Sequence, residues 1–222
     1  FDLANGGDKG WGEEPPYRAL GRQAALAAGE AFDLGTAGAG YGAMAGRLKG
    51  GLGSASAITA DGFAVGAVVA VNSFGSVTAP GGRTFWAAPY EMDGEFGGLG
   101  SAGLAGAGDD WGLAKADPQA RTNTTIACVA TDAVLTPAQA RRVAVMAQDG
   151  LARAIRPIHA PFDGDVVFAL STAQRPLGER PDFQIARLGA LAADVLARAV
   201  ARGVHAAAPW PDAPVPCWRD LP

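Results

Sequence analysis

The sequence predicts a layered fold in which α-helices cover a β-sheet. Apolar segments of strand length lie at residues 66–71, 125–131 and 166–171, and segments with helical spacing of apolar residues lie at 17–30, 137–155 and 183–204. Hydrophobic residues make up 49% of the 222 residues, which is ample for a core. Helices on the outside with sheet between them bury the apolar faces of both kinds of element.

Composition restricts the possible functions. The length fits one domain, or one large domain made of two interleaved halves. The net charge is −4 and no basic stripe is present, so we expect no nucleic-acid partner. No apolar run approaches the length of a membrane span and no signal peptide is visible, so we expect no membrane partner.

The two cysteines and the first residue give further expectations. Cys128 lies in a strand pattern and Cys217 lies near the end of the chain. We expect both to be free thiols in a reducing compartment, and hence a cytoplasmic location. The chain begins at Phe1, without an initiator Met, so we expect residues upstream to be missing.

The first half of the chain predicts a helix, a Gly-rich stretch and a strand. Pro15 and Pro16 precede the helix predicted at 17–30. Glycine is so dense at 35–53 that a long helix is excluded, and we expect backbone that passes close to another segment. The strand at 66–71 follows. Residues 78–112 predict an irregular, partly mobile surface region suited to a processing loop or a substrate-facing segment.

The second half predicts the order strand, helix, strand, helix. A loop-like segment at 100–119 precedes the strand at 125–131. Thr136 as N-cap and Pro137 at the first helical position begin the next helix, which Pro157 ends. A turn at 162–165 leads into the strand at 166–171, and the last helix occupies about 183–204. The Pro-rich tail from residue 209 predicts an extended arm.

Asn123 and Thr124 lie at the mouth of the strand at 125–131. A hydroxyl at this position could attack the carbonyl of the preceding residue and break the chain. The freed α-amine has an ordinary pKa of about 8 and could act as a base near neutral pH. Thr124 would then be nucleophile and base in one residue. The alternative is a polar strand entry without chemistry.

Four further residues are candidates for the same site. Asp163 and Asp165 flank one glycine immediately before a strand and could orient an amine or share a proton; the alternative is an ordinary Asp-Gly turn. Lys49 could stabilise an oxyanion or lower a neighbour's pKa, or it could be a solvated lysine. Asn72, at the end of a strand, could donate its amide to an oxyanion or could cap a turn.

The sequence around the motifs for other kinds of site does not support a nucleotide site, a metal centre or a Ser-His-Asp triad. The glycines at 38–43 formally match a dinucleotide fingerprint, but no strand precedes them and later glycines would disrupt the helix that must hold the pyrophosphate. The two histidines, His159 and His205, lie on different elements, so a metal centre or a Ser-His-Asp triad is poorly supported. We therefore expect neither a cofactor nor a metal.

Several segments together resemble the self-cleaving L-aminopeptidase/D-amidase/esterase family, peptidase family S58. This family includes β-peptidyl aminopeptidases and 6-aminohexanoate-oligomer (nylon) hydrolases. The likeness runs through nearly the whole chain, and its order and spacing are specific. The segments that carry it are residues 1–9, 48–56, 71–75, 123–126 (Asn-Thr-Thr-Ile), 149–157 and 163–170.

The resemblance implies an α+β fold, the four-layer αββα sandwich of N-terminal-nucleophile hydrolases. Residues 1–222 would form a single αββα domain, with 1–123 the C-terminal part of an α chain and 124–222 the β chain after self-cleavage at Asn123–Thr124. The resemblance also implies an upstream family segment, which we expect to be missing from this sequence. The resemblance also places Lys49 and Asn72 beside the nucleophile, with Asn72 as oxyanion donor. Asp163 and Asp165 would organise the nucleophile and the substrate amine.

These observations predict an autoprocessed N-terminal-Thr amidohydrolase or aminopeptidase. It would cleave short peptides, amino amides or esters, and linear amide (nylon) oligomers are the second choice of substrate. Two rivals are an acyltransferase of the ornithine-acetyltransferase type and an unprocessed binding protein without catalysis. The resemblance further implies a homo-oligomer of αβ units.

Overall fold

A computed structural model describes residues 10–101, 110–116, 123–211 and 215–222. The motif at 1–9 lies outside the described residues, as do parts of the predicted loop at 100–119 and of the tail from 209. Of the helices in the described ranges, none combines the length and the apolar character that a membrane crossing requires.

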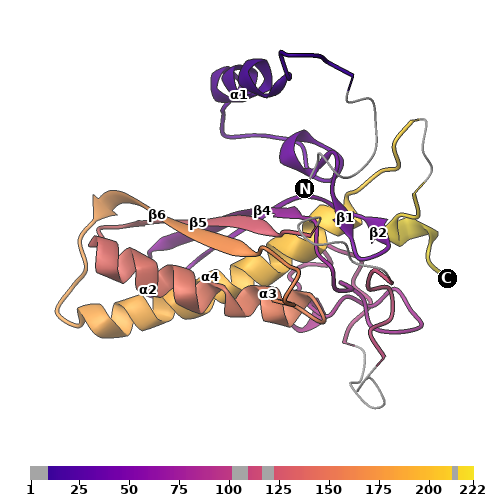
Figure 1. Cartoon of the computed structure of the whole chain (residues 1–222). Coiled ribbons are helices and arrows are strands. Elements are labelled where there is room, and N and C mark those ends of the chain that lie inside the picture. Colours follow the sequence, from indigo (N-terminus) through magenta and orange to yellow (C-terminus); the bar gives the residue numbers. More distant parts are fainter. Residues whose placement is uncertain (1–9, 102–109, 117–122, 212–214) are drawn as a thin grey trace.

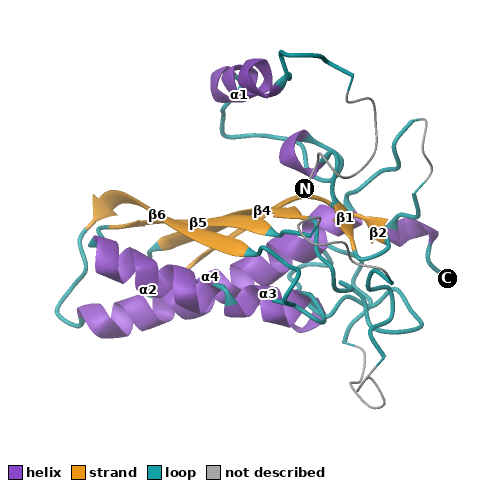
Figure 2. Ribbon diagram, in the orientation of Figure 1, coloured by secondary structure: helices purple, strands orange, loops and turns teal. Residues whose placement is uncertain are grey.

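A four-stranded sheet forms the centre of the molecule (Figure 2). Neighbouring strands are antiparallel from β3 to β5, whereas β5 and β6 are parallel. The parallel pair has Ile126 opposite Val166, so the starts of β5 and β6 lie at the same edge of the sheet. The strands, in spatial order, are β3 (Gly51–Ile58), β4 (Ala64–Val71), β5 (Ile126–Ala133) and β6 (Val166–Arg175).

Helices α2 (Pro137–Ala147) and α4 (Pro181–His205) cover one face of this sheet (Figure 1), and α3 (Asp149–Ala154) packs against both helices. Alternation along the strands explains this side of the core, because Ala127 and Val129 of β5 point toward the helices and are buried. In α4, apolar side chains that include Leu188 and Leu196 are buried against the strands.

The opposite face of the sheet carries apolar side chains that are exposed. Phe168 is 58% exposed, Leu170 54% and Ile126 42%. The described residues therefore contribute one helical layer and one large sheet of the predicted four-layer arrangement. The second sheet of an αββα sandwich would lie on this exposed face.

Strand β3 was not predicted from the sequence, because its glycines are unfavourable for a strand. The same glycines explain how β3 packs. A Cβ atom at Gly53 would lie 1.9 Å from the carbonyl oxygen of Ala199, in α4. A Cβ atom at Gly203 of α4 would in turn lie 2.8 Å from the backbone nitrogen of Gly53. The expected close passage of the Gly-rich segment is therefore confirmed, since glycine lets β3 and α4 approach backbone to backbone.

The single helix predicted at 137–155 is two helices in the structure. Thr136 caps α2 as predicted, accepting from the backbone N–H of Gln139, whose side chain accepts in turn from the N–H of Thr136. The chain then breaks at Gln148, and α3 begins at Asp149. Gly150 of α3 lies against the backbone of Ala193 in α4, which only a glycine permits.

The remaining elements are short or peripheral. Helix α1 (Tyr17–Leu26) has no buried residue and stands away from the sheet (Figure 1). Strands β1 (Met44–Ala45) and β2 (Leu48–Lys49) pair with each other. The region at 78–112 is irregular as predicted where it is described, but it is not all surface. Phe85 and Phe96 are buried, and Phe85 stacks on Trp218 with ring centroids 5.4 Å apart.

Candidate active site

The Asn123–Thr124 bond lies immediately before β5, at the sheet edge where the parallel strand β6 also begins. Asn123 forms an isolated parallel bridge with Asp163, which continues the pairing of β5 with β6. This pairing places the turn with Asp163, Gly164 and Asp165 beside Thr124. Asn123 is fully buried and Thr124 is partly buried.

Three hydrogen bonds hold the atoms around this bond. The Thr124 hydroxyl donates to the carbonyl oxygen of Asn123 at 2.5 Å. The same oxygen accepts the backbone N–H of Gly164 at 3.1 Å, and the backbone N–H of Thr124 donates to the carbonyl oxygen of Asn72 at 2.9 Å. The hydroxyl therefore lies next to the carbonyl that it would attack, and a donor faces the oxygen that would become negative.

Asp165 connects the residue after Thr124 to a histidine. Its buried carboxylate accepts the backbone N–H of Thr125 through Oδ1 at 2.8 Å, and its Oδ2 lies 3.0 Å from Nδ1 of His159. The backbone N–H of His159 also points at Oδ2, and Nε2 of His159 lies 3.4 Å from the side-chain nitrogen of Gln148. Asp165 thus fixes the backbone at the start of β5.

Asp163 has a buried carboxylate with few hydrogen bonds to offset its loss of hydration. Neither oxygen has a well-formed hydrogen bond among the described residues. Burial and the neighbouring Asp165 carboxylate raise the pKa of Asp163 to about 6, while the Phe74 amide, Lys115 and His159 act in the opposite direction. A carboxyl group with this pKa can exchange a proton near neutral pH.

Lys115 is the cation of this cluster. Its ammonium donates to the side-chain oxygen of Asn123 at 2.7 Å. Burial lowers the pKa of Lys115 to about 8, and the Asp163 carboxylate opposes that shift.

Asn72 is fully buried at the end of β4. Its side-chain oxygen accepts the backbone N–H of Met44 at 2.9 Å, and its backbone oxygen accepts from Thr124. The side chain is therefore held in place by β1, next to the strand entry that holds Thr124.

Lys49 is fully buried and is not a solvated lysine. Its three ammonium protons face three backbone carbonyl oxygens, those of Gly40, Ala43 and Gly50, at 2.9–3.0 Å. Burial lowers its pKa to about 8. In this arrangement Lys49 holds the Gly-rich loop at 40–43, and Met44 at the end of that loop contacts Asn72.

The structure therefore brings together Asn123, Thr124, Asn72, Asp163 and Asp165, with Lys49 connected to them through the Gly-rich loop. Sequence reasoning missed the roles of Lys115, Gly164 and His159. The Asp-Gly-Asp spacing could have drawn attention to Gly164. No sequence pattern singles out Lys115, since its neighbour Asn123 is reached through tertiary structure.

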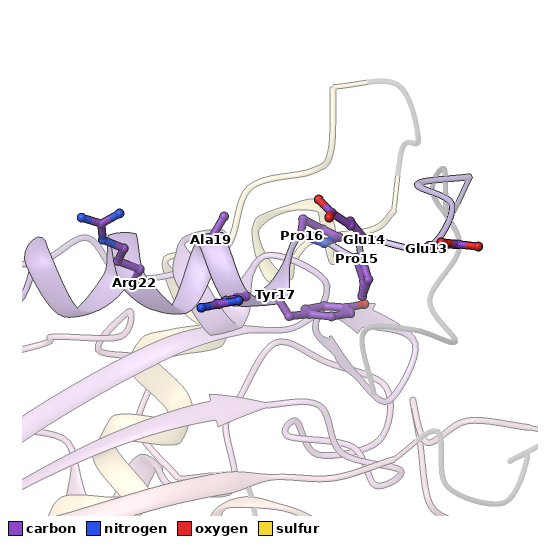
Figure 3. A pocket seen from close by; sticks show the side chains of 8 residues that line it. Glu13, Glu14, Pro15, Pro16, Tyr17, Ala19 and Arg22 are labelled. Atoms are coloured by element: carbon purple, nitrogen blue, oxygen red, sulfur yellow. The ribbon is translucent and has the colours of Figure 1, made fainter.

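Other features of the described residues offer no competing centre. A hollow of about 890 Å³ lies along the start of α1 and is lined by side chains such as Glu14, Tyr17 and Arg22 (Figure 3). It contains none of the residues named above. Within the described ranges, no three His, Cys, Asp or Glu side chains are grouped to hold a metal ion. Cys128 and Cys217 are free.

Comparison with known proteins identifies relatives. The model of peptidase family S58 matches residues 6–213. The chain is 42% identical over 235 aligned residues to an uncharacterised aminopeptidase of Mycobacterium tuberculosis; the match covers 100% of this chain and 65% of that protein. A 6-aminohexanoate-oligomer endohydrolase of Paenarthrobacter ureafaciens is 32% identical over 85 residues, which cover 35% of this chain and 24% of that enzyme.

A solved structure agrees with the fold. The L-aminopeptidase D-Ala-esterase/amidase of Ochrobactrum anthropi, described as a variant of the Ntn-hydrolase fold, superposes with a TM-score of 0.54 at 22% identity. The superposition covers 84% of this chain and 48% of that one. The predicted α+β fold of the N-terminal-nucleophile-hydrolase type is therefore confirmed. Because the family model matches almost the whole sequence, the chain belongs to peptidase family S58.

Proposed function

We propose that this chain carries the catalytic centre of an autoprocessed N-terminal-Thr amidohydrolase. One observation supports the proposal above all: the hydroxyl of Thr124 and the N–H of Gly164 both contact the carbonyl oxygen of Asn123. A nucleophile and an oxyanion donor thus meet at one peptide bond, at the start of a strand.

In the proposed self-cleavage, Thr124 Oγ1 attacks the carbonyl carbon of Asn123 through a five-membered ring. The Gly164 N–H stabilises the oxygen as it becomes negative, and Asp163, buried and without a well-formed partner, is the proposed acceptor of the hydroxyl proton. The C–N bond then breaks, its nitrogen takes up the proton, and an ester remains. Water hydrolyses the ester, which leaves a carboxylate on Asn123 and a free α-amine on Thr124.

Turnover would repeat this chemistry on a substrate amide. The α-amine of Thr124 takes the proton from its own hydroxyl, and water later releases the acyl group. Asn72 is the proposed oxyanion donor for the substrate. Lys49 supports Asn72 through the loop at 40–43, because Met44 at the end of that loop donates its backbone N–H to the Asn72 side chain. Asp163 and Asp165 organise the nucleophile and the substrate amine.

The proposed substrates are short peptides, amino amides and esters, from which the enzyme removes amino-terminal residues. The relative from Paenarthrobacter ureafaciens favours linear amide oligomers as the second class. An acyltransferase of the ornithine-acetyltransferase type would use the same Thr chemistry. Acetyl transfer from an ornithine donor to glutamate without net hydrolysis would indicate that activity instead.

The remaining expectations stay proposals. The chain would form one domain that self-cleavage divides into 1–123 and 124–222. The processed protein would assemble as a homo-oligomer of αβ units in the cytoplasm.

Substitution at two adjacent threonines tests this function in the full-length protein. Thr124→Ala should abolish both self-cleavage and amide hydrolysis, whereas Thr124→Ser should retain both at a reduced rate. Thr125→Val is the matched control, because the buried Thr125 hydroxyl has no hydrogen-bond partner among the described residues. Normal amide hydrolysis by Thr124→Ala would show that the mechanism is wrong, and an intact, inactive parent chain would favour the binding-protein alternative.

A further inference from the structure

Lys115 reaches the proposed cleavage site from the loop that precedes it in sequence. Its backbone N–H donates to the carbonyl oxygen of Phe74, which fixes the start of the side chain. Its ammonium then donates to the side-chain oxygen of Asn123 at 2.7 Å. The Asn123 side-chain nitrogen is buried and has no partner among the described residues, so within them Lys115 is the one anchor of that amide.

Asn123 is thereby held at two separate points. The Gly164 N–H binds its carbonyl oxygen, and the Lys115 ammonium binds its side chain. The next residue is held as well, because the Thr124 N–H donates to Asn72. Rotation of the peptide group between Asn123 and Thr124 would break at least one of these bonds.

The groups around the Lys115 ammonium are compatible with the negative charge that develops on Asn123 during self-cleavage. Asp163 bridges to Asn123 and lies close enough for its carboxylate to interact with Lys115. Asp165 and His159 are the next charged or titratable groups, and both act on Asp163. Self-cleavage adds a carboxylate to the main chain of Asn123, next to this ammonium, so the cation would also stabilise the product.

We propose that Lys115 is a positioning residue for self-cleavage, which holds the side chain of Asn123 so that its carbonyl carbon faces the hydroxyl of Thr124. This inference rests on the proposed self-cleavage and deepens it. Lys115 touches the residue that is attacked, and it acts on the reacting atoms through that residue.

The test compares self-cleavage rates of full-length variants, followed by intact mass after rapid purification. Lys115→Met should slow cleavage about 10- to 100-fold, the range expected for one hydrogen bond to a charged group. Lys115→Arg should recover part of the rate, because it keeps a charged donor. Arg141→Met, which removes an exposed cation on α2, should cleave like the parent.

A double-mutant cycle separates positioning from a general structural effect. If Lys115 acts through the Asn123 side chain, Lys115→Met should slow an Asn123→Ala chain much less than it slows the parent. Equal slowing in both backgrounds would overturn the proposal, as would a Lys115→Met chain that cleaves at the parental rate.

The pH profile decides the question if Lys115→Met fails to fold. The parent's cleavage rate should decline above about pH 8, where Lys115 loses its charge, and Lys115→Arg should lack that decline. Identical profiles would contradict the positioning role. A parent chain that never cleaves would instead overturn the proposed function, so the two failures are distinguishable.

Discussion

The hydroxyl of Thr124 donates a hydrogen bond to the carbonyl oxygen of Asn123, the residue before it, at 2.5 Å. This contact places the oxygen of a side chain next to the peptide group that joins the two residues. A productive attack needs the reacting atoms about 3 Å apart and the carbonyl oxygen in reach of a donor. The Gly164 N–H supplies that donor.

Replacing Gly164 by Ala should slow self-cleavage about 100-fold or more, similar to the loss of an oxyanion donor. The reason is steric: a Cβ atom at Gly164 would lie 2.9 Å from Thr124 Oγ1. Either the hydroxyl or the turn that carries the N–H must move. The cleavage half-time of the purified precursor measures the effect.

Gly82→Ala is the control for this substitution. A Cβ atom at Gly82 would have no atom within 4 Å, so this variant should cleave like the parent. A Gly164→Ala chain that cleaves as fast as Gly82→Ala would refute the proposed geometry at Thr124.

Asp165→Ala should slow self-cleavage about 10- to 100-fold, because it removes the charged acceptor that holds the Thr125 N–H. Asp132 offers a matched comparison at the other end of β5, where its carboxylate accepts the backbone N–H of Ala64 at 2.9 Å. Asp132→Ala should lower stability without slowing cleavage. Equal slowing by both variants would mean that strand stability, and not local positioning, controls the reaction.

Asp163→Asn should raise the free energy of unfolding above that of the parent, and this gain should be larger at pH 7 than at pH 4. The pKa of Asp163 is raised in the folded state from 3.8 to about 6, mainly by burial. A raised pKa means that the folded state binds the proton more tightly, so this stabilisation is complete below pH 3.8 and is lost as the pH rises through 6. Asparagine resembles the protonated form and does not titrate.

Urea unfolding of uncleaved Thr124→Ala chains, with and without Asp163→Asn, measures this difference at both pH values. The exposed Asp33→Asn serves as the control for loss of a carboxylate. A stability gain at pH 4 as large as that at pH 7 would contradict the assignment of the shift to Asp163.

Lys49→Met should lower the free energy of unfolding by about 3 kcal/mol or more, because three backbone carbonyls around the buried ammonium lose their donor. Arg47→Met is the comparison two residues away. Arg47 also donates to a backbone carbonyl, that of Gly112, but its side chain is exposed, so the loss should stay below about 1 kcal/mol. Similar losses for both variants would argue against the structural role of Lys49.

Much of the fold could be predicted because periodicity reports burial directly. The strands ending at Val71 and beginning near Ile126 and Val166 follow from their apolar and β-branched residues, and α4 follows from its regular stripe. Strand β3 could not be predicted, since its sequence is rich in Gly, Ser and Ala and is unfavourable for a strand in isolation. Its close contact with α4 compensates for that weakness.

The candidate site could be predicted in part. Asn123, Thr124, Asp163 and Asp165 lie at the starts of two strands, and the parallel pairing of those strands brings them together. Lys115 reaches the site through a contact with Asn123 that no local pattern encodes. Lys49 differs in a similar way from the alternative of a solvated lysine, because its burial depends on the folded chain.

N-terminal sequencing with intact mass of the purified full-length protein tests the central claim most directly. If the Asn123–Thr124 bond cleaves itself, a fragment beginning Thr-Thr-Ile-Ala-Cys-Val should appear in the parent and be absent from Thr124→Ala. A parent chain that stays intact through prolonged incubation, or a new N-terminus at another residue, would contradict the assignment of Thr124 as the nucleophile.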